Sequence, residues 1–299
     1  MTFESWGRYP FTDQQGGYVV SRHDVLPQHD QTFLPYGNGR SYGDSCLNKD
    51  GLVLSTKQLK RFIAFDPELG ILRCESGVLL KTILQTFVPK GWFLPVVPGT
   101  QYVTVGGAIA NDVHGKNHHR NGTFGHFVVA FELLRSDGQR LTCSPTENTD
   151  YFYASIAGLG LTGLITWADI QLQPVKSSSM LQETIKYHSL DDFFELSEAS
   201  EHTYDYNVAW LDCLASGRQL GRGHFTRANH SDQSSKASDH PNRVLSVPFS
   251  PPISLVNKVT LKLFNSLYFH RQRASRRHSQ VQYESLLLPL DCLKKLKNR

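Results

Sequence analysis

The segment PYGNGRSYGD, residues 35–44, places three glycines around one arginine and one tyrosine. Glycine is favoured where the backbone takes a positive φ or approaches a ligand closely, so a nucleotide phosphate is the first ligand to consider. The fingerprint GxGxxG would need a glycine at position 42, where Tyr42 stands, and a helix after it, whereas residues 45–55 read as loop and strand. The chain also lacks the P-loop pattern GxxxxGK[ST]. A phosphate site here would therefore belong to another fold.

Two more glycine clusters follow, VPGTQYVTVGGAIANDVHGKNHHRNGTFG at 97–125 and AGLGLTG at 157–163. Three glycine-rich loops separated by strands suit an extended ligand held by backbone N–H groups from several directions. For any single loop, the alternative that its glycines only serve a tight turn stays open.

The composition is that of a soluble globular protein, with 39% hydrophobic and 19% charged residues. No apolar run approaches the roughly 20 residues that a membrane-spanning helix needs. The N-terminal segment lacks the basic and apolar regions of a secretory signal. The five cysteines are scattered without a CxxC pair, which predicts free thiols in a reducing, cytoplasmic compartment.

The net charge of +4 is unevenly distributed, with +8 on residues 255–299 and −4 on the rest of the chain. A basic segment can meet the phosphates of nucleic acid or anionic lipid, or it can be a solvated surface. The interleaved aromatic residues of a nucleic-acid-binding module are absent, so we expect no nucleic-acid partner. Peripheral contact with the inner face of the membrane through basic residues 258–277 and a merely solvated surface both stay open.

The pattern up to residue 176 predicts a mixed α+β domain with many short strands. Strands are expected at 51–59, on both sides of a turn at 66–70, and at 160–175. Residues 127–145 indicate a hairpin around an Asp-Gly turn. Helices are expected over 78–91, ending at Gly91, over 104–113 and over 146–158.

The serines at 177–179 mark a domain boundary, which gives domains 1–176 and 177–299. The second domain begins with a helical pattern at 190–200 and a strand pattern at 204–214. Residues 226–243 are polar and without periodicity, which predicts a mobile loop near 226–245. Residues 255–277 form a basic amphipathic stretch.

The segments PYGNGRSYGD, PVVPGTQYVTVGGAIANDVHGKNHH, GTFG and GLGLTGLI together resemble the PCMH-type flavoprotein fold of the vanillyl-alcohol oxidase superfamily. More narrowly, they resemble the decaprenylphosphoryl-β-D-ribose oxidase family. The resemblance is dense over residues 30–176 and weaker as far as LLLPLD at 286–291. It implies an α+β protein in which a two-subdomain FAD-binding domain precedes an incomplete α+β substrate (cap) domain.

The resemblance implies that the first loop cradles the FAD pyrophosphate. Many relatives in the wider superfamily carry a histidine after the second glycine of this loop, covalently bonded to the flavin. Arg40 occupies that position and cannot form the bond, so non-covalent FAD is implied. Tyr42 matches a tyrosine on the substrate side of the isoalloxazine, with a packed loop aromatic as the alternative. The implied contacts are Tyr36, Gly37, Asn38, Gly39, Arg40, Ser41, Tyr42 and Gly43.

The second and third clusters are implied to continue the cofactor site. His114 matches a histidine needed for activity in the family, and Lys116 lies beside it in the sequence. Either cation near the flavin N1–C2=O edge would stabilise the reduced, anionic ring. The catalytic candidates are therefore His114, Lys116 and Tyr42. The further cofactor contacts implied are Gly99, Thr104, Val105, Gly106, Gly107, Asn111, Asp112, Val113, His114 and Ile165.

His114, His118 and His119 also raise the question of a metal, because 114 and 118 are spaced i, i+4. Gly115 and the Asn/His run argue for a loop, and no carboxylate or cysteine completes a ligand set. We therefore expect no metal site.

The reaction implied is oxidation of a secondary alcohol, with hydride delivered to flavin N5 while a base takes the hydroxyl proton. In the named family the substrate is a polyprenyl-phosphate sugar oxidised at the ribose 2′-hydroxyl, and an epimerase-type reductase is the implied partner for 2′-epimerisation. Two alternatives stay open. One is a sugar-lactone or alditol oxidase of the same superfamily, and the other is a flavin-binding protein with an incomplete active site.

Family members continue beyond the PLD segment and return to the flavin with a lysine and a tyrosine that nothing in this chain matches. We therefore expect the sequence to be C-terminally truncated. Whether it is a fragment, a truncated gene product or a chain completed by a partner stays open, and the catalytic base is left unassigned.

Overall fold

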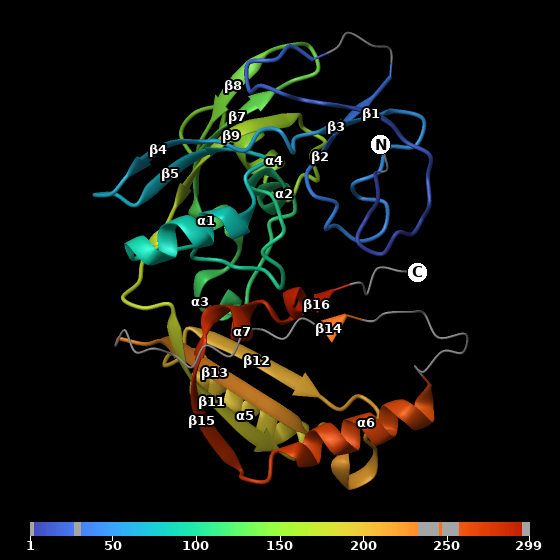
Figure 1. The fold of residues 1–299 in the computed structure, drawn as a ribbon, viewed down its shortest axis with the longest axis vertical. Coiled ribbons are helices and arrows are strands. Elements are labelled where there is room, and N and C mark those ends of the chain that lie inside the picture. Colours follow the sequence, from blue (N-terminus) through green and yellow to red (C-terminus); the bar gives the residue numbers. More distant parts are fainter. Residues whose placement is uncertain (1–2, 27–30, 233–244, 247–256, 295–299) are drawn as a thin grey trace. The chain divides into compact units, whose positions relative to one another are not determined.

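The computed structural model describes residues 3–26, 31–232, 245–246 and 257–294. It forms two compact units, Met1–Gly115 with Asn121–Val175, and Lys116–Arg120 with Lys176–Asn298 (Figure 1). The sequence places its boundary between residues 176 and 177. The short segment Lys116–Arg120 differs, because it groups with the second unit although it lies within the predicted first domain.

The first unit begins with a parallel three-stranded sheet. Its order is β1 (Gln15–Tyr18), β3 (Leu52–Ser55), β2 (Phe33–Tyr36). Tyr36 is paired in register with Ser55. Because parallel strands end at the same edge, the glycine loop after Tyr36 emerges beside the segment after Ser55.

A five-stranded antiparallel sheet completes the first unit (Figure 1). In spatial order its strands are β4 (Phe62–Asp66), β5 (Ile71–Glu75), β9 (Leu164–Gln171), β7 (Val128–Leu134) and β8 (Arg140–Cys143). A two-stranded ladder joins β6 (Trp92–Phe93) to β10 (Gln173–Pro174). The turn at 66–70 and the Asp-Gly hairpin occur as predicted.

The helices of this unit lie within the segments predicted to be helical, except the third in chain order, where a loop was predicted. They are α1 (Leu80–Phe87), α2 (Val105–Ala110), α3 (His118–Asn121, shared with the second unit) and α4 (Thr149–Ser155), with 3₁₀ turns at Val88–Lys90 and Phe124–Phe127. In α1, the i, i+3, i+4, i+7 spacing buries Leu80, Ile83, Leu84 and Phe87. Each such side chain contributes about 1.5–3 kcal/mol. The helical segment ends at Gly91, whose φ of 83° suits glycine.

The second unit is an antiparallel sheet with helices. In spatial order its strands are β12 (Tyr206–Leu211), β13 (Gly223–His230), β11 (Ser179–Tyr187) and β15 (Arg276–Gln282). The helices are α5 (Leu190–Glu201), α6 (Lys258–Arg271) and α7 (Tyr283–Leu287). A further ladder pairs β14 (Leu245–Ser246) with β16 (Leu293–Lys294), and 3₁₀ turns lie at Gly217–Gln219 and Pro289–Cys292. Together the two units confirm the predicted α+β class.

Strand β13 corrects the prediction of a mobile loop near 226–245. Residues 226–230 pair with β11 on one side, and residues 226–228 pair with β12 on the other. Residues 233–244 lie outside the described ranges, so the rest of that prediction is untested. This polar segment can form a strand inside the sheet because its charged side chain, Arg227, is paired with a carboxylate of the neighbouring strand. Arg227 donates to the Glu183 carboxylate from Nε at 2.8 Å and from Nη2 at 2.7 Å.

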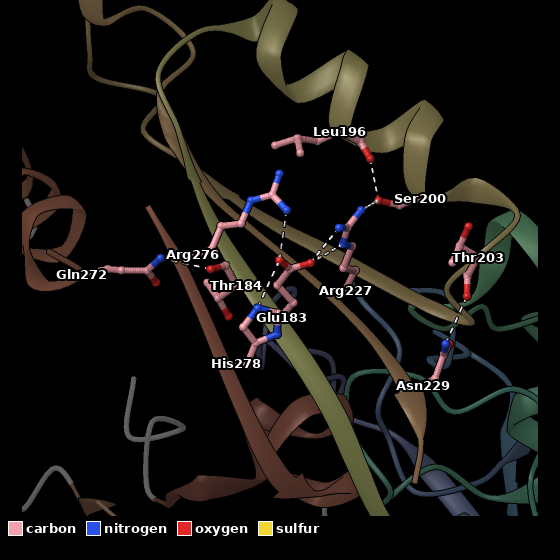
Figure 2. A network of polar contacts seen from close by, with 10 residues as sticks. All are labelled: Glu183, Thr184, Leu196, Ser200, Thr203, Arg227, Asn229, Gln272, Arg276 and His278. Carbon is pink, nitrogen blue, oxygen red and sulfur yellow. Dashed lines mark hydrogen bonds and ion pairs between the residues drawn. The ribbon is translucent and has the colours of Figure 1, made fainter. Parts of the chain in front are cut away.

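Figure 2 shows how Glu183 gathers this polar network. The side chain is only 5% exposed. Arg276 Nη1 and His278 Nε2 of β15 lie 3.4 and 3.5 Å from Oε1. Arg227 also donates to the Ser200 hydroxyl of α5. A buried carboxylate thus links three elements that are distant in sequence.

Two other predictions are corrected by the second unit. The basic stretch 255–277 is not one amphipathic element, because α6 ends at Arg271 while Arg276 and Arg277 belong to strand β15. Its first residues, 255–256, lie outside the described ranges. The Asn/His run was expected to be a loop, but His118–Asn121 forms one helical turn. Within the described ranges, no helix combines the length and apolarity needed to span a bilayer.

Candidate functional site

The first glycine cluster forms a series of turns directly after β2. Gly39 and Gly43 adopt φ values of 62° and 59°, the left-handed region where glycine carries no steric penalty. A Cβ on Gly37 would overlap the Thr104 hydroxyl, so this loop lies against the second cluster. The N–H groups of Gly37, Gly39 and Gly43 have no hydrogen-bond acceptor within the described part of the chain. They therefore remain available as donors to a bound anion.

Cationic side chains surround this loop. The Arg40 guanidinium lies 5.1 Å from the centre of the Trp6 ring and 5.7 Å from that of Tyr102. Lys81 Nζ lies 5.2 Å from the centre of the same Tyr102 ring.

Lys57, which follows β3, completes this group, with its Nζ 5.3 Å from the centre of the Tyr36 ring. Partial burial, together with the positive charge of Arg40, lowers the pKa of Lys57. Cations held close enough to depress a lysine pKa favour a negatively charged ligand between them.

Tyr36 supports the loop through its side chain. Its hydroxyl donates to the Glu4 carbonyl at 2.8 Å, and its ring packs edge-on against Phe3. Burial raises the pKa of this phenol. The Tyr36 backbone carbonyl accepts a hydrogen bond from the Thr56 amide, which fixes the start of the loop against the segment after β3. The Asn38 side chain ties the loop to the second glycine cluster by donating from Nδ2 to the Tyr102 carbonyl at 2.7 Å.

The second cluster uses its backbone donors differently from our expectation. Thr104 caps α2 by accepting the Gly107 amide at 3.1 Å. The amides of Val105 and Gly106 donate to the carbonyls of Val78 and Ser76, both at 2.8 Å. These three N–H groups are already engaged by the protein. The glycines here therefore provide room for close approach rather than free donors.

Two buried hydroxyls lie beside these loops without hydrogen-bond partners in the described residues, Ser55 and Ser76, each 1% exposed. Ser55 is opposite Tyr36 in the parallel sheet, and a Cβ on Gly106 would lie 3.0 Å from Ser76 Cβ. A buried hydroxyl without a partner is costly, so such groups mark places where a polar ligand atom would fit.

The third cluster is clamped to α2. The amides of Ala157 and Leu159 donate to the carbonyls of Ile109 and Ala110 at 3.1 and 2.8 Å. Both residues have positive φ, 62° and 54°, which costs free energy for a non-glycine residue. Arg135 holds the end of the loop by donating to the Thr162 carbonyl at 3.1 Å.

A cavity of about 920 Å³ is lined by the third cluster and by β2 and β3, and reaches the first cluster only at Pro35. This volume is within the roughly 300–1,000 Å³ that is common for small-molecule sites. Ile165 lies next to this lining, buried at the start of β9. The lining includes Phe33, Pro35, Leu54, Arg135, Gly160 and Leu164.

The residues after α2 make hydrogen bonds within the first unit. Asn111 Nδ2 donates to the Gly107 carbonyl at 2.9 Å, and Asp112 Oδ1 accepts the Gly125 amide at 2.8 Å. The Val113 carbonyl accepts the Phe124 amide, and His114 forms a β-bridge with Thr123. Tyr42 is 74% exposed, so it is not a packed loop aromatic in this structure.

Lys116 belongs to the second unit. Its ammonium donates to the Leu287 carbonyl at 2.9 Å, and its own carbonyl accepts the Asn207 amide. Burial lowers the pKa of Lys116. Among the predicted catalytic residues, Lys116 is thus grouped apart from His114 and Tyr42.

The histidine run does not assemble a metal site in the described ranges. His119 Nε2 lies 3.0 Å from the Tyr204 carbonyl and 3.2 Å from Asn207 Nδ2. This imidazole therefore connects α3 to β12 within the second unit.

The predicted residues 36–43, Gly99, 104–107, 111–114 and Ile165 all belong to the first unit. Sequence reasoning missed Lys57, Lys81, Tyr102 and the two serines. The position of Lys57 could have been inferred from the sequence. It follows β3 by two residues, and the ends of parallel neighbouring strands lie close together, so it would be expected near the loop after β2. Nothing local to Lys81 indicated its position.

The comparisons with known proteins point to the same region. Residues 19–144 match the family model of an FAD binding domain. This region is an FAD binding domain of that family. It spans the first glycine cluster, the second cluster and all three cations named above.

Relatives extend the match further along the chain. Decaprenylphosphoryl-beta-D-ribose oxidase of Mycolicibacterium smegmatis is 35% identical over 85% of this chain and 57% of its own length. Human delta(24)-sterol reductase is 34% identical over 40% of this chain and 23% of its own length. Mouse L-gulonolactone oxidase is 30% identical over 58% of this chain and 40% of its own length. The chain thus spans just over half of the first of these relatives and less of the other two.

Proposed function

We propose that the first unit binds FAD non-covalently, as part of an oxidoreductase that oxidises a secondary alcohol of a polyprenyl-phosphate-linked sugar at the ribose 2′ position. The first glycine cluster carries the proposal. It offers three backbone donors without acceptors in the described residues, together with Arg40, Lys57 and Lys81. A pyrophosphate needs this combination of directed N–H donors and positive charge.

The surrounding residues fit the rest of the cofactor. The Ser55 and Ser76 hydroxyls can donate to polar atoms of the ligand, which would satisfy two buried groups. The 920 Å³ cavity beside Pro35 and Gly160 suits the adenosine end. Arg40 stands where a covalent attachment would need a histidine, which supports dissociable FAD.

FAD, when bound, would supply the hydride acceptor for the sugar C–H. The chain's own residues would hold the cofactor and handle charge. Arg40, Lys57 and Lys81 would neutralise the charge of the pyrophosphate. The hydrogen bonds between the third cluster and α2 would hold the wall of the adenosine pocket in place. Lys116, whose pKa is lowered by burial, would release a proton from Nζ more readily than an ordinary lysine. The substrate class rests on the decaprenylphosphoryl-beta-D-ribose oxidase match, which covers 85% of this chain.

The cofactor proposal is tested by the visible spectrum of the purified chain before and after acid precipitation. We expect a flavin spectrum and FAD released into the supernatant. Flavin retained in the pellet would contradict non-covalent binding, and folded protein that takes up no added FAD would overturn the proposal.

A charge test sharpens this result. Lys57→Gln should weaken FAD binding by about fivefold or more, since a cation beside phosphate contributes on the order of 1 kcal/mol. Lys60→Gln removes an exposed lysine of the same segment and should leave FAD affinity unchanged. Equal effects of the two substitutions would show that general charge, not the loop, governs binding.

A sugar-lactone oxidase is the second candidate, favoured by the L-gulonolactone oxidase match over 58% of the chain. The two are separated by adding each substrate anaerobically to the FAD-loaded chain and following loss of the flavin colour. Bleaching by the polyprenyl-phosphate ribose supports our proposal, and bleaching by the lactone alone supports the second candidate. FAD binding without bleaching by either would favour a flavin-binding protein with an incomplete active site.

A further inference from the structure

Helix α6 of the second unit exposes a row of large apolar side chains. Val259, Leu263 and Leu267 are spaced four residues apart and are 76%, 61% and 65% exposed. Phe264, beside them, is 58% exposed. Because residues four apart share one face of a helix, these side chains form one outward stripe. An exposed stripe of this kind on a folded helix needs a physical explanation.

The opposite face of α6 is firmly anchored. Asn265 Nδ2 donates to Asp212 Oδ1 at 2.7 Å, and Asp212 forms a buried ion pair with Arg222 at 2.8 Å. Phe269 is 3% exposed and stacks on His224 at 5.7 Å between ring centres.

Tyr268 adds a ring contact with Trp210 at 4.6 Å. The helix therefore lies with its contact face against the sheet, near β12 and β13 in Figure 1, and cannot turn its apolar stripe inward without breaking these contacts.

Positive charge accompanies the stripe. Residues 257–277 contain six Lys and Arg residues and no Asp or Glu. Lys262 lies on α6 about 100° from Leu263, and Lys258 lies about 100° from Val259, when the helix is projected at 3.6 residues per turn. Arg271 lies near the other margin, and Arg273 follows the helix.

We propose that this face of α6 docks peripherally on an anionic lipid bilayer, with the apolar stripe entering the headgroup boundary and the flanking lysines and arginines meeting lipid phosphates. A helix with apolar side chains on one side and cations at its margins lies in the plane of such an interface. Charge complementarity selects the bilayer over a second copy of this chain, because two copies would bring the same cations together. The proposal does not depend on FAD binding.

The experiment is sedimentation of the 299-residue chain with vesicles of equal parts phosphatidylglycerol and phosphatidylcholine, and with vesicles of phosphatidylcholine alone. We expect binding to the anionic vesicles, weakened by added salt, and little binding to the zwitterionic ones. Leu263→Ser should weaken the partition constant about tenfold, since it removes a buried leucine from the interface. Lys262→Glu should weaken it by more than about fivefold, since each cation near an anionic surface strengthens binding about fivefold.

Matched controls keep this result specific to α6. Leu69→Ser replaces a leucine of the β4–β5 turn that is 62% exposed, close to the 61% of Leu263. Lys60→Glu reverses an exposed charge in the first unit. Both controls should bind vesicles like the parent chain. Circular dichroism and the urea midpoint should be unchanged in all four variants, because each site is exposed.

Three outcomes would overturn the proposal. The first is equal binding to both kinds of vesicle, or to neither. The second is a control variant that loses as much binding as its α6 counterpart. The third is a dimer in sedimentation equilibrium that Leu263→Ser converts to monomer while vesicle binding persists, which would assign the stripe to a second copy of the chain.

Discussion

The first glycine cluster and the sheet of the second unit differ in whether their hydrogen-bond donors have acceptors within the protein. In the cluster, backbone N–H groups at Gly37, Gly39 and Gly43 have no acceptor in the described residues. In the sheet, buried cations are satisfied by carboxylates, with Arg227 on Glu183 and Arg222 on Asp212. One arrangement leaves donors available for a ligand, and the other uses them to hold the fold.

The difference shows why polar residues in the two regions carry different meanings. Donors fixed in position without acceptors favour an anion from outside. A buried arginine that is paired with a carboxylate stabilises the fold. Removing either partner leaves the other charge buried and unpaired, which lowers the free energy of unfolding. If this distinction holds, substitutions in the second unit change stability, and substitutions in the glycine clusters change cofactor binding.

The largest effect is expected at the buried ion pair of the second unit. Asp212→Ala should lower the free energy of unfolding by about 3–5 kcal/mol, because it leaves Arg222 buried and unpaired. Urea unfolding followed by circular dichroism measures this loss. Asp232→Ala breaks the exposed pair with Lys176 and serves as the control, with no measurable change expected. Similar losses in the two variants would show that burial does not set the importance of the pair.

The same carboxylate should give the second unit a pH-dependent stability. Burial acts to raise the pKa of Asp212, but hydrogen bonds from Arg222, Asn265 and the Leu214 amide outweigh it and hold the pKa below its ordinary value. A depressed carboxyl pKa contributes stability above the unfolded pKa of about 4 and loses it as the pH falls through the folded value. The stability difference between the parent chain and Asp212→Asn should thus be constant at neutral pH and shrink below about pH 4. A difference that grows on acidification would contradict the assignment.

A methyl group on Gly107 tests the cradle itself. Gly107→Ala should weaken FAD binding by about tenfold, because one added methyl at a close contact costs on the order of 1–3 kcal/mol. The free energy of unfolding without FAD should change by no more than about 1 kcal/mol, because the better helix propensity of alanine is opposed by a contact of 3.0 Å between its Cβ and the Thr104 hydroxyl. Gly17→Ala, where a Cβ would contact nothing within 4 Å, is the control for FAD titration. Unchanged affinity in Gly107→Ala would remove this glycine from the cofactor site.

The smallest effect compares the same capping chemistry in both units. Thr104 caps α2 and Ser189 caps α5, each accepting a backbone amide at 3.1 Å. Replacing either by alanine should cost about 1 kcal/mol in stability. Only Thr104→Ala should also weaken FAD binding, because its hydroxyl lies against Gly37. An equal loss of FAD affinity in Ser189→Ala would mean that general destabilisation explains both.

Local patterns in the sequence predicted elements whose cause is local. The period of Leu80, Ile83, Leu84 and Phe87 predicted α1, and Gly91 marked its end. The Asp-Gly pair predicted the β7–β8 hairpin. The local pattern gave the wrong prediction for residues 226–230. Their segment is polar, and it can be a central strand only because Arg227 pairs with Glu183, which lies 44 residues earlier in the chain. His118–Asn121 failed similarly, since His119 contacts the Tyr204 carbonyl 85 residues away.

The sequence by itself determined the glycine-rich loops and, through their resemblance to a flavoprotein family, the FAD binding domain. Those features depend on residues close together in the chain, since a glycine permits a turn wherever it stands. Only the tertiary structure decided which amides remain available, that the N–H groups at 105–107 are already engaged, and that Lys57 and Lys81 belong beside Arg40. It also placed Lys116 with the second unit. Each of these depends on pairing between distant segments, which the order of residues along the chain does not express.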